Sequence, residues 1–304
     1  MEYKANITNI SRGSFHDGPG IRTVVYFGGC ILSCKWCHNP ETLSFKSDVV
    51  YIKSKCIHCG RCVEICPQGH EIRGNDMYFN RVSCKKCGKC AELCPSGALT
   101  VTSKPYTPEK LFKEIKKDKF YFNQSSGGVT FSGGECLLQA DFLKEVLKYC
   151  REEKINTCIE SAFFVPFENI LKVINDIDFV FADLKIPDRE KHKEYTGQYN
   201  DRIIENIRKT SEIHSNIIIR IPLIPGVNDS ERDMADFARI INTFGCGVKG
   251  VELLKYNYLA ESKYENLGKE YTKFSENTQS DGHLNSLLKA LKTNLVRDIE
   301  VFYK

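Results

Sequence analysis

The sequence predicts an α/β fold built from strand–helix units, interrupted near its start by a small cysteine-rich domain. The chain has 304 residues, enough for one large domain and a smaller one. Short β-branched runs alternate with helical patterns over most of it, as in parallel α/β proteins. Eleven of the 15 cysteines fall in three compact groups between residues 30 and 94. We therefore expect a large domain from residues 1–49 and 104–304, and an insert at 50–103.

Six segments have the short apolar character of buried parallel strands. They are Arg22–Phe27, Gly128–Ser132, Asn156–Ser161, Phe179–Leu184, Asn216–Ile221 and Gly250–Leu254. Apolar residues at helical spacing lie between or after them. These helical patterns are Asp141–Lys154, Phe167–Ile177, Asp233–Phe244 and residues 284–295. Six such units form either an open doubly wound sheet or an incomplete barrel, and periodicity does not distinguish the two.

Composition and charge narrow the class of protein. The formal net charge is only +4, and no long basic run is present, so nucleic acid is not the expected partner. The longest apolar stretch, Ile217–Val227, is interrupted by Arg220 and two prolines, and falls short of the roughly 18 residues that a membrane helix needs. The first residues lack a signal-peptide core. We expect a cytoplasmic protein that binds neither membranes nor nucleic acid.

Two of the cysteine groups repeat each other. Residues 56–67, CIHCGRCVEICP, and residues 84–95, CKKCGKCAELCP, both follow the pattern C-x2-C-x2-C-x3-C-P. In bacterial two-cluster ferredoxins, three cysteines of each run hold one [4Fe–4S] cluster and the fourth ligates the other. The sequence thus predicts one cluster on Cys56, Cys59, Cys62 and Cys94, and a second on Cys84, Cys87, Cys90 and Cys66.

Zinc is the alternative occupant of these two runs. Zinc motifs usually separate two C-x2-C pairs, whereas here four thiols lie within eleven residues and are followed by proline, twice. The insert also has few large apolar residues. We therefore expect iron–sulfur clusters, and we expect metal binding and folding of the insert to be coupled.

The remaining group is GCILSCKWCHNPE, residues 29–41, with thiols at Cys30, Cys34 and Cys37. Cys30 follows the first predicted strand by three residues, at the carboxyl edge where α/β folds place their active sites. Three thiolates can hold three irons of a [4Fe–4S] cube and leave the fourth iron open to a ligand. The group therefore predicts a reactive cluster rather than simple electron storage.

The motif C-x3-C-x-φ-C, with Trp36 as its aromatic residue, together with GGE after the next strand, resembles the radical S-adenosylmethionine (SAM) superfamily. The segments SFHDGPGIRTVVYFGGC, HNPE, FSGGE, FADLK and IRIPLIPGVND resemble those of glycyl radical enzyme activating enzymes. The resemblance covers nearly the whole chain. It implies a partial (β/α)6 barrel of radical SAM type with an inserted ferredoxin-like domain that holds two [4Fe–4S] clusters.

The resemblance also implies an activity and its partners. SAM bound at the third cluster would be cleaved reductively to a 5′-deoxyadenosyl radical, which abstracts a hydrogen atom from a backbone glycine of a partner glycyl radical enzyme. A reduced flavodoxin or ferredoxin would supply electrons. Relatives with this insert serve dehydratases, lyases and decarboxylases, and hydroxyproline dehydratase is our first guess. A radical SAM enzyme that acts on a small molecule and a polyferredoxin-like electron carrier are the alternatives.

Site residues follow by motif from the same resemblance. Cys30, Cys34 and Cys37 would hold the reactive cluster, and Asp183 and Lys185 would join them as catalytic residues. The expected SAM contacts are Trp36, Gly133, Gly134, Glu135, Glu160, Asp183, Lys185, Arg220 and Asn257. The two glycines would let the ligand approach the backbone, and Glu135 would receive its ammonium. Glu160 and Arg220 have an alternative interpretation as an ion pair within the barrel.

Several positions depart from the family pattern or carry a second interpretation. Cys136 stands where proline usually follows GGE, and Asn257 replaces a histidine expected near the nucleoside; an amide cannot carry a charge. The turn HDGPG, residues 16–20, either borders the peptide site or is structural. We expect the charged run PDREKHKE, which includes His192, to be a solvated loop.

Overall fold

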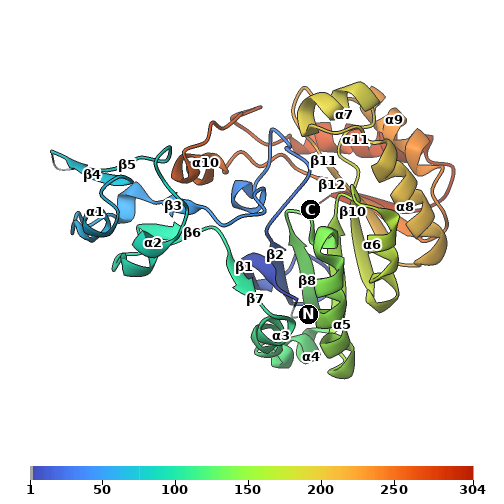
Figure 1. Cartoon of the computed structure of the whole chain (residues 1–304). Helices are drawn as coiled ribbons and strands as arrows, with labels where there is room; N and C mark the ends of the chain where they lie inside the picture. Colours follow the sequence, from blue (N-terminus) through green and yellow to red (C-terminus); the bar gives the residue numbers. More distant parts are fainter. Residues whose placement is uncertain (1–2, 75, 304) are drawn as a thin grey trace.

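The computed structural model describes residues 3–74 and 76–303 (Figure 1). Its main feature is a nine-stranded sheet in the order β13-β12-β11-β10-β9-β8-β2-β1-β7. The strands are β1 Ala5–Ser14, β2 Arg22–Phe27, β7 Lys104–Tyr106, β8 Gly128–Gly133, β9 Asn156–Ser161, β10 Phe179–Asp183, β11 Ile217–Pro222, β12 Val248–Leu254 and β13 Glu300–Tyr303. All six predicted strands are present, with bounds within two residues of those expected.

The strand order decides between the two predicted architectures. A doubly wound sheet reverses its order at a switch point. Here β2 and then β8 to β13 follow chain order across the sheet, and each pairs in parallel with the next. The order is that of an incomplete barrel, so the doubly wound alternative is wrong. β1 and β7 add an antiparallel edge that makes the sheet mixed.

Helices connect the strands of the sheet. They are α3 Pro108–Lys116, α4 Lys119–Ser125, α5 Ala140–Glu152, α6 Phe167–Leu171, α7 Arg189–Thr196, α8 Asp201–Ile213, α9 Glu231–Ile241, α10 Glu261–Leu267 and α11 Asp281–Asn294. α5 buries Phe142, Val146 and Leu147 as its pattern predicts. The helix expected over Phe167–Ile177 is shorter than predicted. α6 ends at Leu171, and a 3-10 turn follows at Ile174–Asp176.

The charged run that contains His192 differs from the prediction. It forms α7 rather than a loop, and His192 is fully buried. Its Nδ1 donates a hydrogen bond of 2.6 Å to the carbonyl of Gln198, and Asp188 caps the helix by accepting from the Lys191 amide. The charges lie on the exposed side of α7, while His192 and Thr196 face inward. His192 and Thr196 are four residues apart, which places them on one face of a helix, and the charged composition of the run did not reveal this spacing.

The cysteine-rich region between β2 and β8 folds into small elements. They are β3 Val49–Tyr51, α1 Arg61–Ile65, β4 His70–Arg73, β5 Asp76–Phe79, α2 Lys89–Leu93 and β6 Leu99–Val101. β3 pairs antiparallel with β6, and β4 with β5. Figure 1 shows this region projecting away from the sheet, with the β3–β6 pair at its base. Its apolar core is small, and most of its cysteines pack against it.

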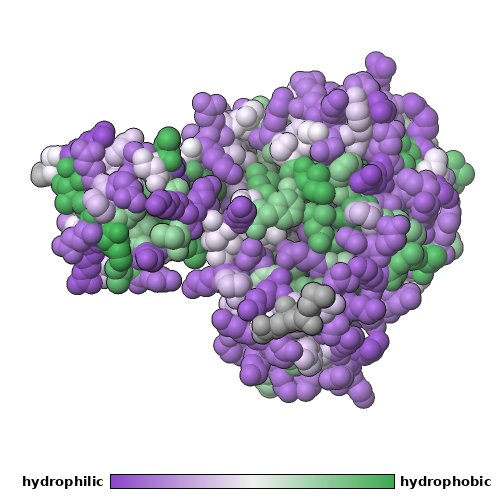
Figure 2. All heavy atoms as spheres, in the orientation of Figure 1, coloured by the Kyte–Doolittle hydropathy of each residue, from purple (hydrophilic) through white to green (hydrophobic). Residues whose placement is uncertain are grey.

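The surface is mixed in character. Figure 2 shows that hydrophilic side chains cover most of one face of the molecule, while hydrophobic ones are exposed on the cysteine-rich region and over the middle of the barrel. Ile57, Ile72 and Val82 are among the exposed apolar residues of the cysteine-rich region. Within the described part of the chain, no helix has both the length and the apolar character that crossing a bilayer would require.

Candidate active site

A cavity of about 330 Å³ lies at the carboxyl ends of the parallel strands. Its volume is within the range of small-molecule sites. Eleven of the twelve predicted catalytic and SAM-contact residues line it: Cys30, Cys34, Trp36, Cys37, Gly133, Gly134, Glu160, Asp183, Lys185, Arg220 and Asn257. They come from the loop after β2 and from the ends of β8 to β12, so the fold unites segments that lie up to 227 residues apart, between Cys30 and Asn257.

The loop with the three cysteines is held in place by other parts of the chain. The amides of Ser33 and Lys35 donate hydrogen bonds of 2.8 and 3.0 Å to carbonyls at the end of α7. On the other side, the hydroxyl of Tyr264 in α10 donates one of 2.9 Å to the carbonyl of Cys37. Trp36 is buried against Ile224 and neighbouring apolar residues. The loop is therefore fixed without regular secondary structure of its own.

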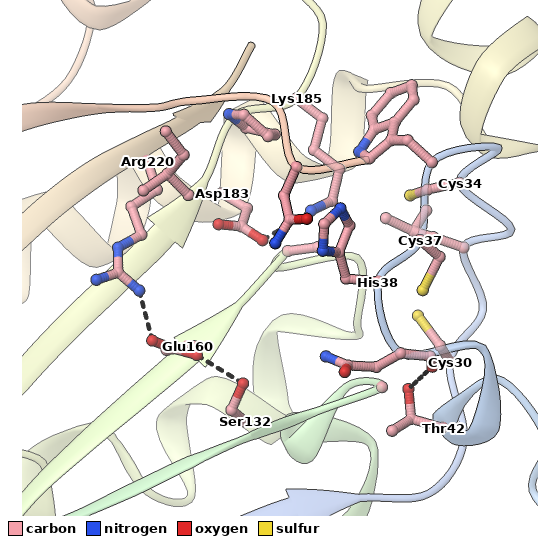
Figure 3. A pocket seen from close by; sticks show the side chains of 18 of the residues that line it. Cys30, Cys34, Cys37, His38, Thr42, Ser132, Glu160, Asp183, Lys185 and Arg220 are labelled. Atoms are coloured by element: carbon pink, nitrogen blue, oxygen red, sulfur yellow. Dashed lines mark hydrogen bonds and ion pairs between the residues drawn. The ribbon is translucent and has the colours of Figure 1, made fainter. Parts of the chain in front are cut away.

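The thiols suit an iron–sulfur cluster in chemistry and surroundings. Cys30, Cys34 and Cys37 all face the cavity (Figure 3). Burial raises the pKa of Cys30 and of Cys34 to about 12, while the nearby ammonium of Lys185 acts in the opposite direction. Metal coordination would remove the thiol protons, and the Lys185 charge would offset part of the resulting negative charge. The donor set is that of iron–sulfur clusters.

Asp183 and Lys185 form an ion pair beside the thiols. The Lys185 Nζ lies 2.7 Å from Asp183 Oδ2, and both side chains are mostly buried. Burial alone would lower the pKa of Lys185, but Asp183 and the Cys34 thiol outweigh it and raise the pKa above its ordinary value. Asn228 fixes the segment by donating a 2.6 Å hydrogen bond to the Lys185 carbonyl. The cavity therefore contains a permanent ammonium and a carboxylate within reach of one ligand.

A second charged group lies at the ends of β9 and β11. Arg220 forms an ion pair with Glu160 and a hydrogen bond of 2.7 Å from Nε to Glu252. Its guanidinium also lies 3.3 Å from the ring centroid of Phe181. Ser132 donates a 2.6 Å hydrogen bond to the other oxygen of Glu160. Two carboxylates thus share one guanidinium, and burial raises the pKa of Glu160 to about 7.

Comparison with known proteins identifies the family behind this geometry. The radical SAM superfamily model matches residues 24–238. A (2S)-3-sulfopropanediol dehydratase activating enzyme of Klebsiella oxytoca is 41% identical, over 87% of this chain and 86% of that protein. A 4-hydroxyphenylacetate decarboxylase activating enzyme of Clostridioides difficile (strain 630) is 40% identical, over 92% and 91%. The chain belongs to the glycyl radical enzyme activating enzymes of the radical SAM superfamily.

One further relative supports this assignment, and one solved structure shares the fold. A trans-4-hydroxy-L-proline dehydratase activating enzyme of Clostridioides difficile is 39% identical, over 87% of this chain and 88% of that protein. Among solved structures, Streptococcus suis SuiB bound to its precursor peptide SuiA has a TM-score of 0.56 and covers 92% of this chain and 48% of its own. That structure is only 13% identical, so the likeness concerns the fold. Members of the family generate a radical by SAM cleavage.

The GGE motif of this radical SAM protein packs tightly against the rest of the barrel. A Cβ on Gly133, which has a φ of +110°, would lie 2.2 Å from the Phe27 amide nitrogen, and one on Gly134 would lie 2.3 Å from the Gly29 carbonyl. The glycines are therefore required for packing against β2 and the cysteine loop. Glu135 is the predicted residue that does not line the cavity.

The carboxylate of Glu135 is held at the end of β9 instead. It accepts hydrogen bonds from Ser161 Oγ at 2.8 Å, from the Ala162 amide at 3.0 Å and from the Leu137 amide at 3.2 Å. The residue is 3% exposed, and these three hydrogen bonds hold its carboxylate in place. The contact of Glu135 with the ammonium of SAM therefore stays a prediction.

The site also includes His38, which the sequence did not predict, and the structure places Cys136 and the HDGPG turn, whose roles the sequence left undecided. His38 lines the cavity together with Asn257, which is itself exposed. His38 stands directly after the third cysteine, in the HNPE segment, which is the signal that could have identified it. Cys136 is fully buried, and it lies behind the GGE turn rather than in the cavity lining. The carbonyl of His16 accepts from Arg220 at 2.6 Å, so the HDGPG turn contacts the site.

Proposed function

We propose that this chain binds SAM in the 330 Å³ cavity and passes the resulting radical to a backbone glycine of a partner enzyme. The observation that supports this most is the joint lining of one cavity by three thiols, an ammonium, a guanidinium and two carboxylates. SAM carries an ammonium, a carboxylate and a sulfonium, so a site for it needs charges of both signs close together.

Cys30, Cys34 and Cys37 would hold a [4Fe–4S] cluster with one iron left for SAM. When bound, the cluster supplies the electron that breaks a carbon–sulfur bond of SAM. The protein residues bind and orient: Lys185 would pair with the SAM carboxylate, and Glu160 would receive its ammonium. Asp183 would exchange part of its contact with Lys185 for the ammonium or the incoming peptide. Trp36 and the apolar residues after β11 would exclude water.

We also propose that the cysteine-rich region is a ferredoxin-like domain, residues 50–103, with two further [4Fe–4S] clusters. A small apolar cavity in it is lined by Cys56, Cys59, Cys62 and Cys94. These are the four cysteines that the motif assigns to one cluster. Burial, together with the neighbouring Cys84, Cys66 and Cys87, raises the pKa of Cys90 to about 11, which supports their grouping around the second cluster. A reduced flavodoxin or ferredoxin would supply the electrons.

The partner is proposed as a dehydratase, lyase or decarboxylase of the glycyl radical type. Relatives named for sulfopropanediol dehydratase, 4-hydroxyphenylacetate decarboxylase and hydroxyproline dehydratase are 41, 40 and 39% identical, so overall identity does not select among these clients. Hydroxyproline dehydratase is the first to test. We place the protein in the cytoplasm, because fifteen free cysteines, eleven of them proposed as ligands, need a reducing compartment.

Electron paramagnetic resonance of anaerobic mixtures tests this function. Reduced holoprotein, SAM and a candidate partner should give a glycyl radical doublet together with 5′-deoxyadenosine, and Cys34→Ala should give neither. If 5′-deoxyadenosine forms without a glycyl signal with any of the candidate partners, the protein acts on a small molecule. If no 5′-deoxyadenosine forms from SAM, it is an electron carrier, and the proposal fails.

A further inference from the structure

The β3–β6 pair gives the cysteine-rich region a near end and a far end relative to the barrel. Val49 pairs with Val101 where the chain enters and leaves, and Tyr51 pairs with Leu99 further out. The two motifs lie at opposite ends of this pair. Cys56 follows Tyr51, and the Cys94 thiol accepts a 3.4 Å hydrogen bond from the Leu99 amide, so the first cluster's ligands lie at the far end.

The second motif, residues 84–90, lies at the near end. Lys86 forms an ion pair of 2.6 Å with Asp48, the residue before β3. A Cβ on Gly88 would lie 3.2 Å from the Val101 side chain. The loop that contains Cys84 and Cys87 therefore packs against the end of the β3–β6 pair that is connected to the barrel.

Helix α10 makes the direct connection between this motif and the barrel. Arg81, three residues before Cys84, donates hydrogen bonds of 2.9 Å to the Val49 carbonyl and 2.6 Å to the carbonyl of Asn266 in α10. The residue after α10, Gly268, has a φ of +63°, and a Cβ there would lie 2.3 Å from Arg81 Nε. Arg81 thus fills a space that only glycine leaves open.

The same helix contacts the cysteine loop of the active site. Tyr264 donates to the Cys37 carbonyl at 2.9 Å and is 7% exposed. The neighbouring Lys263 donates to the His38 carbonyl at 2.9 Å and forms an ion pair of 3.1 Å with Glu41. Figure 1 shows α10 between the cysteine-rich region and the barrel. The seven-residue helix α10 therefore contacts both the segment before the second cysteine motif and the cysteine loop of the active site.

We propose that Arg81 and α10 form a bridge that holds the second cysteine motif at a fixed distance from the active-site cysteine loop, so that electrons reach the cavity from the cluster on Cys66, Cys84, Cys87 and Cys90. The cluster on Cys56, Cys59, Cys62 and Cys94 is then the entry point for the external donor. This inference rests on the proposed two-cluster domain. Each SAM cleaved consumes one electron, which the reduced flavodoxin or ferredoxin loses. Arg81 is a positioning residue, since it touches neither SAM nor the active-site thiols.

The test compares two ways of breaking the bridge with one matched control. Arg81→Ala removes both hydrogen bonds, and Gly268→Ala displaces Arg81 while leaving it in the chain. The control, Arg73→Ala, removes an arginine of the same region whose side chain forms an ion pair with Glu71 and lies over the Tyr78 ring at the outer hairpin. Iron and sulfide content is measured first for each holoprotein. Hydrogen–deuterium exchange of residues 261–267 and 47–51 then reports whether the bridge is broken.

The rate of 5′-deoxyadenosine formation is measured with reduced flavodoxin and, separately, with dithionite, a small reductant that does not need the insert. In both bridge variants, the amide hydrogens of α10 should exchange faster than in the wild type. The flavodoxin-driven rate of 5′-deoxyadenosine formation should fall at least about tenfold, because positioned reactions are sensitive to displacements of about an ångström. Their dithionite-driven rates and the control variant should stay close to wild type.

Three results would overturn the bridge. Unchanged exchange in both variants would show that Arg81 does not hold α10. Faster exchange with an unchanged flavodoxin-driven rate would show that the connection does not serve electron delivery. Equal losses with flavodoxin and dithionite would show a general structural role. If the wild-type protein itself gives no 5′-deoxyadenosine with dithionite, the proposed function has failed instead, and the two failures are distinguishable.

Discussion

Two glutamates near the strand ends, Glu135 after β8 and Glu160 in β9, have the same side chain and different partners. Glu135 accepts three hydrogen bonds from uncharged donors and lies outside the cavity lining. Glu160 faces the cavity and shares Arg220 with Glu252. Sequence motifs placed both near SAM, but spacing along the chain does not state which way a side chain turns. The two glutamates differ because the end of β9 packs against the GGE turn, where Ser161 and Ala162 donate hydrogen bonds to Glu135.

Glu160→Gln should weaken SAM binding by roughly tenfold, about 1.4 kcal/mol, because the amide keeps the size of the side chain and loses the charge that faces the SAM ammonium. Titration calorimetry of the anaerobic holoprotein with SAM measures this. Glu145→Gln, on the exposed side of α5, is the control and should bind as wild type. Unchanged affinity in Glu160→Gln would show that the glutamate is only a partner of Arg220.

Substitutions of cysteines in different groups should reduce SAM cleavage in different ways. Cys34→Ala removes a proposed ligand of the reactive cluster and should abolish SAM cleavage with any reductant. Cys87→Ala leaves that cluster in place and should slow its reduction or destabilise the insert, while dithionite-driven cleavage continues. Both are measured as 5′-deoxyadenosine formed per chain. Full activity of the Cys34 variant would contradict the assignment of the site.

At the scale of elements, the sequence predicted what depends on local pattern. The six central strands and the face of α5 followed from apolar periodicity, since burial on both sides of a parallel sheet leaves a continuous apolar run. β1 was missed because its ten residues mix polar and apolar side chains, and its register with β2 shifts at two places. α7 was taken for a loop because charge dominates its composition. Strand order and the bridge by α10 depend on contacts between distant segments.

Helix α9 offers a test of local stability. Ser230 caps it by accepting from the Asp233 amide, and the Asp233 side chain in turn accepts from the Ser230 amide. Ser230→Ala should lower the free energy of unfolding by about 1 kcal/mol, since both contacts of the capping box are disturbed. Thermal or urea unfolding of the reconstituted protein reports it, with Ser286→Ala, on the exposed part of α11, as control. Equal stability of the two variants would show that the cap contributes nothing.

The whole molecule joins a large apolar barrel to a region whose core is small. The barrel contains most of the buried apolar residues, whereas the core of the cysteine-rich region comprises Val49, Met77, Phe79, Cys90 and Leu99. Stability should therefore be distributed unevenly, with the barrel independent of metal and the insert dependent on it. The motifs predicted this division, because so few apolar residues stand between the cysteines.

Removal of iron by a chelator should accordingly unfold the insert and spare the barrel. Hydrogen–deuterium exchange should become fast across residues 56–94, while β8 to β11 stay protected. Iron and sulfide together should restore protection. Restoration by zinc alone would favour the zinc alternative, and an insert that stays protected without metal would contradict the coupling of its folding to clusters.

The central claim is that Cys30, Cys34 and Cys37 hold a cluster with one iron left open for SAM in the cavity that Glu160, Lys185 and Arg220 also line. An anaerobic crystal structure of the reconstituted protein with SAM tests it most directly. We predict that the amine and carboxylate of SAM ligate the fourth iron, with Glu160 and Lys185 in contact with the methionyl group. A protein side chain on that iron, with SAM bound elsewhere, would contradict the account.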